Sequence, residues 1–100
     1  MKKNYNVTSD GRSKVYYEDL LCRVTLVVAD FRDSSWGISL ETTVDKRNGN
    51  IIKLSKEQRY ELFRRISADS KTELYTTEFK FIKEELSNID GNVSILDFVE

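Results

Sequence analysis

The sequence predicts an α+β fold, in which an antiparallel β-sheet of about four or five strands has two helices packed on one face. Three observations predict it. Apolar and polar residues alternate through the first half of the chain, an Asn-Gly pair separates two apolar runs, and the apolar period lengthens to that of a helix after Ser55. Because the chain has 100 residues, we expect residues 1–100 to form one compact domain around a modest core.

Two strands are the clearest features of the first half. The first has apolar residues at every second position, namely Cys22, Val24, Leu26 and Val28. The second is WGISLETTV, with a predicted buried face of Trp36, Ile38, Leu40, Thr42 and Val44 and a predicted wet face of Gly37, Ser39, Glu41 and Thr43. We expect Phe31–Ser35 to join these two strands as a hairpin. A further hairpin around Asp10-Gly11 should join Tyr5–Thr8 to Lys14–Tyr17.

The Asn48-Gly49 pair predicts another tight turn. A two-residue turn would pair Val44 with Lys53 and place Ile52 on the polar face. A three-residue loop, Arg47–Gly49, instead pairs Val44 with Ile52 and Thr42 with Leu54, and it puts Gly49 in the left-handed conformation. The sequence therefore favours the three-residue loop.

Helical signals follow. Ser55 and Gln58 form a predicted capping box, and a helix should run from there to about Ala68. A second helix, ending before Gly91, is predicted from an apolar stripe made of Tyr75, Phe79, Ile82, Leu86 and Ile89. Strand formers in ELYTTEFKFI leave a strand open over Tyr75–Ile82. Ser94–Val99 reads as a closing strand.

Composition and charge limit the functional classes. The 39% of apolar and 33% of charged residues are typical of a globular protein, and the net charge of −1 creates no general attraction for polyanions. The chain has no long apolar run, so we expect a soluble, cytoplasmic protein without membrane association. Abundant Lys, Asn, Ile, Phe and Tyr suggest an AT-rich coding sequence, typical of low-GC bacteria and their phages; for a phage protein the location would be the host cytoplasm.

Residues that carry common catalytic and metal chemistry are scarce. The chain has no histidine and a single cysteine, Cys22, which lies at a predicted core position. Zinc-ligand spacings and glycine-rich phosphate loops are absent, and Asp30, Asp33 and Asp45 lack the spacing of a calcium loop. We therefore expect no enzymatic activity, no cofactor and no metal.

The stretch RYELFRR, Arg59 to Arg65, raises the question of nucleic-acid binding. On a helical projection Arg64 and Arg65 share a solvated, mixed-charge face with Glu57 and Glu61, which argues against phosphate binding. Tyr60 falls on the arc that faces the sheet. Arg59 falls inside the apolar arc, where it either forms a structural ion pair, snorkels to solvent, or anchors a partner protein.

The function that these features favour is a small regulatory or inhibitory protein that binds another protein and blocks its site. An inhibitor, immunity protein, antitoxin or phage counter-defence factor would fit, as a monomer or a homodimer. Candidate contacts lie at a hairpin tip, on the first helix and in the acidic C-terminal region; they are Phe31, Arg32, Asp33, Arg59, Glu84, Glu85 and Asp97.

Two alternatives remain open. A nucleic-acid-associated regulator would use the basic residues of the N-terminus and of the Asn48-Gly49 hairpin, namely Lys2, Lys3, Arg12, Lys14, Lys46, Arg47 and Lys53. A small-molecule-binding or enzymatic subunit would require an oligomer, with its pocket between subunits.

Overall fold

The computed structural model describes residues 4–31, 35–70, 72–76, 80–81 and 93–97, and these form an α+β fold. The elements, in chain order, are β1 (Tyr5–Ser9), β2 (Lys14–Asp19), β3 (Cys22–Phe31), β4 (Ser35–Asp45), β5 (Ile51–Ile52), α1 (Lys56–Ser70), β6 (Glu73–Tyr75), β7 (Lys80–Phe81) and the 3-10 turn η2 (Ile95–Asp97). The predicted fold class is confirmed in its general form.

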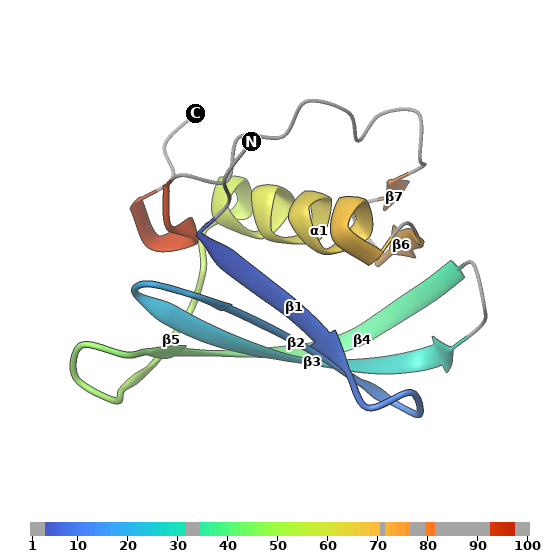
Figure 1. Cartoon of the computed structure of the whole chain (residues 1–100), viewed down its shortest axis with the longest axis horizontal. Coiled ribbons are helices and arrows are strands. Elements are labelled where there is room, and N and C mark those ends of the chain that lie inside the picture. Colours follow the sequence, from blue (N-terminus) through green and yellow to red (C-terminus); the bar gives the residue numbers. More distant parts are fainter. Residues whose placement is uncertain (1–3, 32–34, 71, 77–79, 82–92, 98–100) are drawn as a thin grey trace.

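One sheet contains all the described strands, in the order β1-β2-β3-β4-β6-β7, with β5 also paired to β4. All pairings are antiparallel except that of β4 with β6, which is parallel. Figure 1 shows α1 lying across one face of the sheet, with η2 near the first turns of the helix and β6 and β7 near its last turn. Among the described residues no helix covers the other face of the sheet (Figure 1).

The predicted N-terminal hairpin is confirmed. β1 pairs antiparallel with β2, and the turn lies at Asp10-Gly11. One Asp10 carboxylate oxygen accepts hydrogen bonds from the backbone N–H groups of Arg12, Ser13 and Lys14, at 2.9–3.0 Å. Gly11 has a φ of +74°, a conformation that glycine adopts without steric cost. The Asp10 carboxylate and the left-handed Gly11 therefore stabilise the turn that the sequence predicts.

The core lies between the sheet and α1. From the sheet it contains Val15, Tyr17, Cys22, Val24, Leu26 and Val28, all at most 5% exposed. The helix contributes Leu62, Phe63 and Ile66, and Leu74 and Ile95 complete this buried set from the second half of the chain. The alternation predicted for β3 is thus confirmed.

The buried face predicted for β4 is correct at one end only. Trp36 is buried, but Leu40 is 60% exposed and Thr43 is buried. The register between β3 and β4 shifts between Val27 and Val28, so that Val27 pairs with Leu40 and Val28 with Ile38. Ser39 is the extra residue of a bulge, and the bulge exchanges the two faces of the strand. A simple alternation cannot anticipate this exchange.

The predicted register of β4 with β5 is wrong for the same reason. Val44 pairs with Ile51 and Thr43 with Ile52, so the connection is one residue longer than the three-residue loop. The prediction assumed that Val44 lies on the buried face, whereas Thr43 does. The expected left-handed glycine is confirmed, because Gly49 has a φ of +75° and donates its N–H to the Asp45 carbonyl at 2.7 Å.

The first helix begins as predicted. The Ser55 N–H donates to Gln58 Oε1 at 2.9 Å and the Gln58 N–H donates to Ser55 Oγ at 3.2 Å, which are the two bonds of a capping box. The solvated face predicted for this helix is wrong in part. Glu61 and Arg65 are buried, and Tyr60 is 46% exposed although it was expected to face the sheet.

The predicted second helix is not borne out. Glu73–Tyr75 and Lys80–Phe81 are strands β6 and β7, so the strand formers of this stretch determine its structure where it is described. Residues 82–92 lie outside the described residues. The closing strand predicted over Ser94–Val99 is wrong over Ile95–Asp97, which form η2, because Asp19 binds the backbone there.

Candidate protein-binding site

One side of β4 is only partly paired. β6 pairs with Ser35–Gly37, and β5 pairs with Thr43 and Val44 on the same side of the strand. Between them, residues 38–42 of β4 have no strand beside them within the described parts of the chain. Unpaired strand edges present backbone donors and acceptors to other chains. This interval is therefore a candidate contact surface.

The backbone of Glu41 faces this open side. The Asp45 N–H donates to the Asn50 carbonyl at 2.9 Å, toward β5, whereas the Lys46 N–H donates to the Leu21 carbonyl on the opposite side. Backbone groups of a strand point alternately to its two sides. Counting back from Asp45, the N–H and C=O of Glu41 point to the same side as those of Asp45, which is the open side.

Two hollows adjoin the open interval. One, of about 380 Å³, lies toward β5 and is lined by Glu41, Thr42, Thr43, Ile51, Ile52, Lys53, Leu54, Lys56 and Arg59. The other, of about 530 Å³, lies toward β6 and is lined by Ile38, Ser39, Leu40, Glu41, Arg59 and Thr76. Both include Glu41 and Arg59. We call the two hollows together with β4 residues 38–42 the β4 edge groove.

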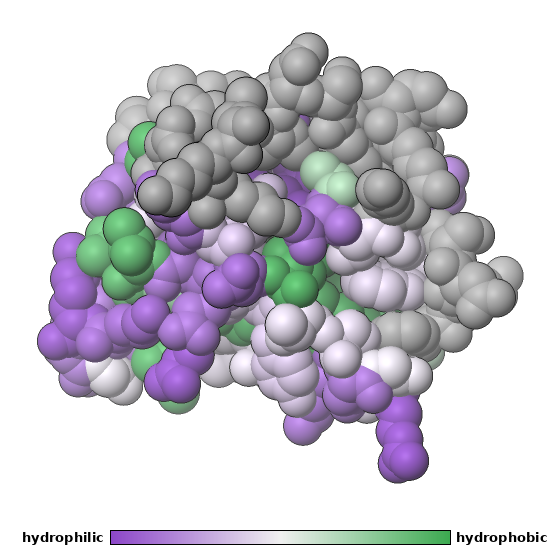
Figure 2. Space-filling model, viewed as in Figure 1, coloured by the Kyte–Doolittle hydropathy of each residue, from purple (hydrophilic) through white to green (hydrophobic). Residues whose placement is uncertain are grey.

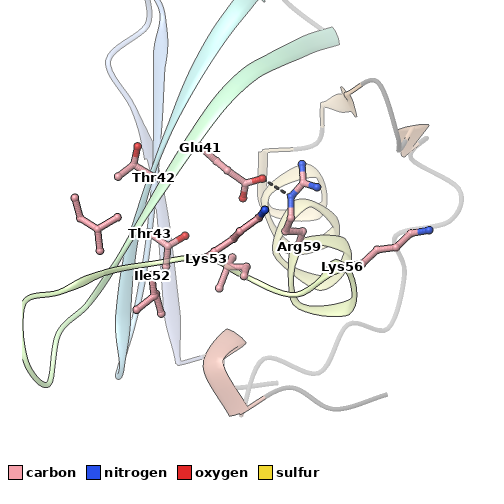
Figure 3. Close-up of a pocket in the computed structure, with 9 residues that line it drawn as sticks. Glu41, Thr42, Thr43, Ile52, Lys53, Lys56 and Arg59 are labelled. Carbon is pink, nitrogen blue, oxygen red and sulfur yellow. Dashed lines mark hydrogen bonds and ion pairs between the residues drawn. The ribbon is translucent and has the colours of Figure 1, made fainter.

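An ion pair lies where the two hollows meet. Arg59, in the first turns of α1, donates its Nε–H to Glu41 Oε1, and its guanidinium lies 5.6 Å from the centroid of the Phe63 ring. Both side chains are mostly buried. Figure 3 shows the Arg59 side chain directed from α1 toward the Glu41 carboxylate. The structural ion pair expected as one possibility for Arg59 is therefore present, and it lines the groove.

The second oxygen of this carboxylate is unusual. Glu41 Oε2 is buried and has no hydrogen-bond partner among the described residues. A buried acceptor without a donor costs free energy, because it has lost its contacts with water. Most buried polar atoms in native proteins bond to a protein group or an ordered water, so this oxygen is a candidate acceptor for a further contact.

The rim of the groove carries two exposed aliphatic side chains. Leu40 is 60% exposed and Ile51 is 74% exposed. Elsewhere, the side of the molecule seen in Figure 2 is mainly hydrophilic, with apolar residues gathered in a few separate places. Protein interfaces typically combine apolar contacts of this kind with a few oriented polar groups, such as the Glu41–Arg59 ion pair. Lys53 and Lys56 are exposed and add positive charge to the rim.

The predicted contact residues are scattered. Phe31 ends β3 and pairs with Trp36, Arg59 lies in the groove, and Asp97 is exposed in η2. Arg32, Asp33, Glu84 and Glu85 lie outside the described residues. The groove therefore contains one of the predicted protein contacts, Arg59, and one residue of the nucleic-acid alternative, Lys53, while the sequence does not indicate Glu41, Leu40 or Ile51. Only one signal pointed to Glu41: an arginine on an apolar arc requires a carboxylate nearby.

The basic residues of the nucleic-acid alternative are partly neutralised. Lys46 lies 2.8 Å from Glu18 and also donates to the Asp19 carbonyl, and Arg47 lies 2.9 Å from Asp45. The Asp45 carboxylate raises the pKa of Arg47. Lys14 and Lys53 are exposed. Lys2 and Lys3 lie outside the described residues. The Asn48-Gly49 hairpin therefore presents fewer unopposed cations than its sequence suggests.

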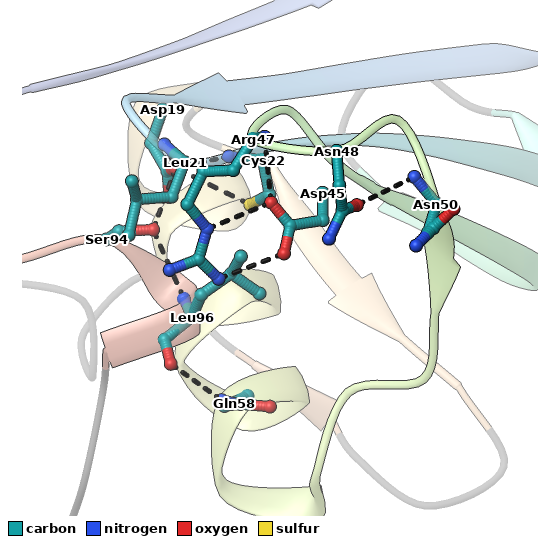
Figure 4. A network of polar contacts seen from close by, with 10 residues as sticks. All are labelled: Asp19, Leu21, Cys22, Asp45, Arg47, Asn48, Asn50, Gln58, Ser94 and Leu96. Atoms are coloured by element: carbon teal, nitrogen blue, oxygen red, sulfur yellow. Dashed lines mark hydrogen bonds and ion pairs between the residues drawn. The ribbon is translucent and has the colours of Figure 1, made fainter.

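A second polar cluster surrounds Asp19 and holds the fold together (Figure 4). Asp19 Oδ1 accepts from the N–H groups of Leu21 and Cys22 and from the Ser94 hydroxyl, at 2.8–3.0 Å. Asp19 Oδ2 accepts from the Tyr17 hydroxyl at 2.8 Å and from the Ile95 N–H at 2.9 Å. This carboxylate is saturated and buried, so it fixes η2 against β2 and offers nothing to a ligand.

Two findings on the described residues concern catalytic and metal chemistry. Burial, with Asp19 alongside, raises the pKa of the Cys22 thiol to about 12, so it is not a ready nucleophile. Within the described ranges, Asp, Glu, Cys and His side chains form no group of three or more suited to a metal ion. The described helix is too short and polar to cross a membrane.

Comparison of the chain with protein-family models, with curated proteins and with solved structures finds no match.

Proposed function

We propose that this chain is a small, non-enzymatic regulatory protein that binds another protein through the β4 edge groove. By occupying a surface of its partner it blocks access to that surface, as an inhibitor, immunity protein or antitoxin does. The observation that carries this proposal is a conjunction of three features: the edge of β4 at residues 38–42, which is unpaired within the described residues, the Glu41–Arg59 ion pair, and the exposed side chains of Leu40 in β4 and Ile51 in β5.

Several features favour a protein over a nucleic acid as the partner. The groove has an aliphatic rim, and its arginine, Arg59, is already paired with Glu41, so this cation is not free for a phosphate group. Two of the predicted phosphate-binding cations, Lys46 and Arg47, are held by carboxylates of this chain. An arginine next to an aromatic ring, as Arg59 is next to Phe63, is a frequent anchor of protein interfaces.

An affinity capture tests the proposal. Tagged protein is incubated with bacterial lysates, with and without nuclease treatment, and the bound material is washed at low and at high salt. We expect one protein to be retained in stoichiometric amount after nuclease treatment and the high-salt wash. Recovery of nucleic acid alone, lost at high salt, would instead support the nucleic-acid alternative and overturn the proposal, because phosphate contacts weaken steeply with salt.

A further inference from the structure

We propose that the β4 edge groove receives an extended segment of the partner, which adds to the sheet as a short strand beside Glu41. This inference rests on the proposed function, because it specifies the chemistry of the protein that the groove binds. The segment has an apolar residue on each side of a central residue with an uncharged hydrogen-bond donor, such as Asn, Gln, Ser or Thr.

The backbone of β4 supports strand addition. The N–H and C=O of Glu41 point to the open side of the strand, as the hydrogen bonds of Asp45 and Lys46 on either side of β4 indicate. An extended peptide placed there supplies one acceptor and one donor to Glu41. The hollows on both sides of Glu41 provide the space that such a segment needs.

The neighbouring strands limit the length of the segment. β6 ends its pairing at Gly37, and β5 begins its pairing at Thr43. A strand on the same side of β4 must therefore fit beside residues 38–42. A partner segment longer than this interval has to leave the sheet at one or both ends. We expect a short paired segment and not a long additional strand.

The faces of β4 determine the side-chain pattern. Glu41 pairs with the buried Leu26 and its side chain faces α1, whereas the exposed Leu40 pairs with Val27 and faces away. Residues directly opposite each other in a sheet project to the same face. The partner residue opposite Glu41 therefore faces the carboxylate, and its two neighbours face the side of Leu40, where apolar side chains bury it.

The carboxylate determines the chemistry of the central residue. Arg59 donates to Glu41 Oε1, and Oε2 is buried without a donor in the part of the chain that the structure describes. The terminal torsion of a glutamate is soft, so the carboxyl group turns at little cost toward a donor that arrives along the edge. Arg59 already pairs with this carboxylate, and the exposed Lys53 lines the same hollow. An uncharged donor satisfies the oxygen without adding a further positive charge.

The test uses peptides as the probe. Binders of the wild-type chain are selected from a display library of random linear peptides, synthesised, and measured by fluorescence anisotropy, with the contact site located by NMR amide shifts. We expect the alternation of apolar, donor and apolar residues, with shifts concentrated at residues 38–42. Glu41→Gln should weaken binding by about tenfold, because the variant places an amide donor where an acceptor is needed.

Two comparisons keep the test decisive. Glu57→Gln makes the same change of charge at an exposed position of α1 outside the groove, and it should leave peptide affinity unchanged. Methylation of the peptide nitrogen that donates to Glu41 should weaken binding as much as Glu41→Gln does, and it leaves the protein intact if Glu41→Gln impairs folding. Thermal unfolding followed by circular dichroism monitors the folding of both variants.

Some results would overturn strand addition without overturning the proposed function. Peptides without alternation, shifts elsewhere on the sheet, equal affinities for wild type and Glu41→Gln, or no selected peptide would overturn strand addition. Self-association of the chain through residues 38–42 would also overturn it, since the occupant would then be a second copy. The proposed function fails if the capture yields no protein, whereas a captured protein that binds Glu41→Gln normally refutes this inference alone.

Discussion

The guanidinium of Arg65 donates its Nε–H to Glu61 Oε2 at 2.8 Å inside the core, one turn apart on α1. Arg65 is 1% exposed, and it also donates to the Tyr17 hydroxyl at 3.0 Å and lies 5.2 Å from the centroid of the Tyr5 ring. Burial lowers the pKa of Arg65, but its bonds to Glu61 and Tyr17 raise it above its ordinary value. This arginine therefore joins the helix to the first two strands.

Replacement of Arg65 by methionine should destabilise the protein strongly. The substitution keeps most of the side-chain volume but leaves the Glu61 carboxylate buried without its cation, which costs about 3–5 kcal/mol. Urea unfolding followed by circular dichroism measures the loss. Arg64→Met is the matched control. Arg64 is the neighbouring residue, it lies farther from the same carboxylate, at 3.5 Å, and its side chain is 32% exposed. Equal losses for both variants would contradict the structural role of Arg65.

The stability of the protein should depend on the ionisation of Asp19. Burial raises the pKa of this carboxyl group, but hydrogen bonds from the Ile95 and Leu21 N–H groups and the Ser94 hydroxyl lower it below its ordinary value. A carboxylate with a lowered pKa in the folded state stabilises that state above its unfolded pKa of about 3.9. This stabilisation is lost as the pH falls through the folded pKa.

The Asp19 prediction is measured by urea unfolding between acidic and neutral pH. We expect the free energy of unfolding of the wild type to fall below about pH 4, and Asp19→Asn to be less stable at neutral pH with a weaker dependence on pH. Asp97→Asn removes an exposed carboxylate of η2 and should retain the wild-type profile. A wild-type profile in Asp19→Asn would show that the network around Asp19 is not a source of stability.

Cys22 should be unreactive in the folded protein. Its side chain is fully buried, and burial together with Asp19 raises the pKa of the thiol to about 12. Only thiolate reacts with iodoacetamide, so alkylation should be at least about a thousandfold slower in the native state than in urea at the same pH. Mass spectrometry of quenched samples measures both rates. Rapid native labelling would mean that β3 is accessible at this position.

The capping box at the start of α1 should contribute measurably to stability. Ser55→Ala removes the acceptor for the Gln58 N–H, and such losses cost about 1 kcal/mol. Ser55→Asp retains an acceptor at this position and should restore most of the stability. Thermal unfolding of the two variants and the wild type compares them directly. An alanine variant as stable as wild type would contradict the role assigned to Ser55.

Much of the fold follows from local patterns. The Asp10-Gly11 turn, the alternation of β3 and the capping box at Ser55 each depend on residues close in the chain, and all three are confirmed. The buried and exposed faces of β4 do not follow from a local pattern, because a bulge at Ser39 exchanges them partway along the strand. Its position depends on how β3 and β4 pair, and no local period in the sequence marks it.

The candidate site was the harder part to predict. The sequence marks Arg59, because an arginine on an apolar arc needs a partner, but no local pattern marks the bulge that turns Glu41 toward α1. Arg65 was assigned to the solvated face, since its partners Tyr5 and Tyr17 come from strands far away in the chain. Buried polar networks of this kind depend on tertiary contacts, so helical periodicity alone misplaces their members.

The measurement that tests the central claim most directly is the affinity of the captured partner for three variants with single substitutions, determined by calorimetry. Leu40→Asn and Ile51→Asn alter the rim of the β4 edge groove, and Leu20→Asn alters a residue that is 71% exposed at the turn between β2 and β3. The account predicts that each rim variant weakens binding by about tenfold, while Leu20→Asn binds as the wild type does. Unchanged binding by both rim variants would contradict the assignment of the groove as the protein-binding site.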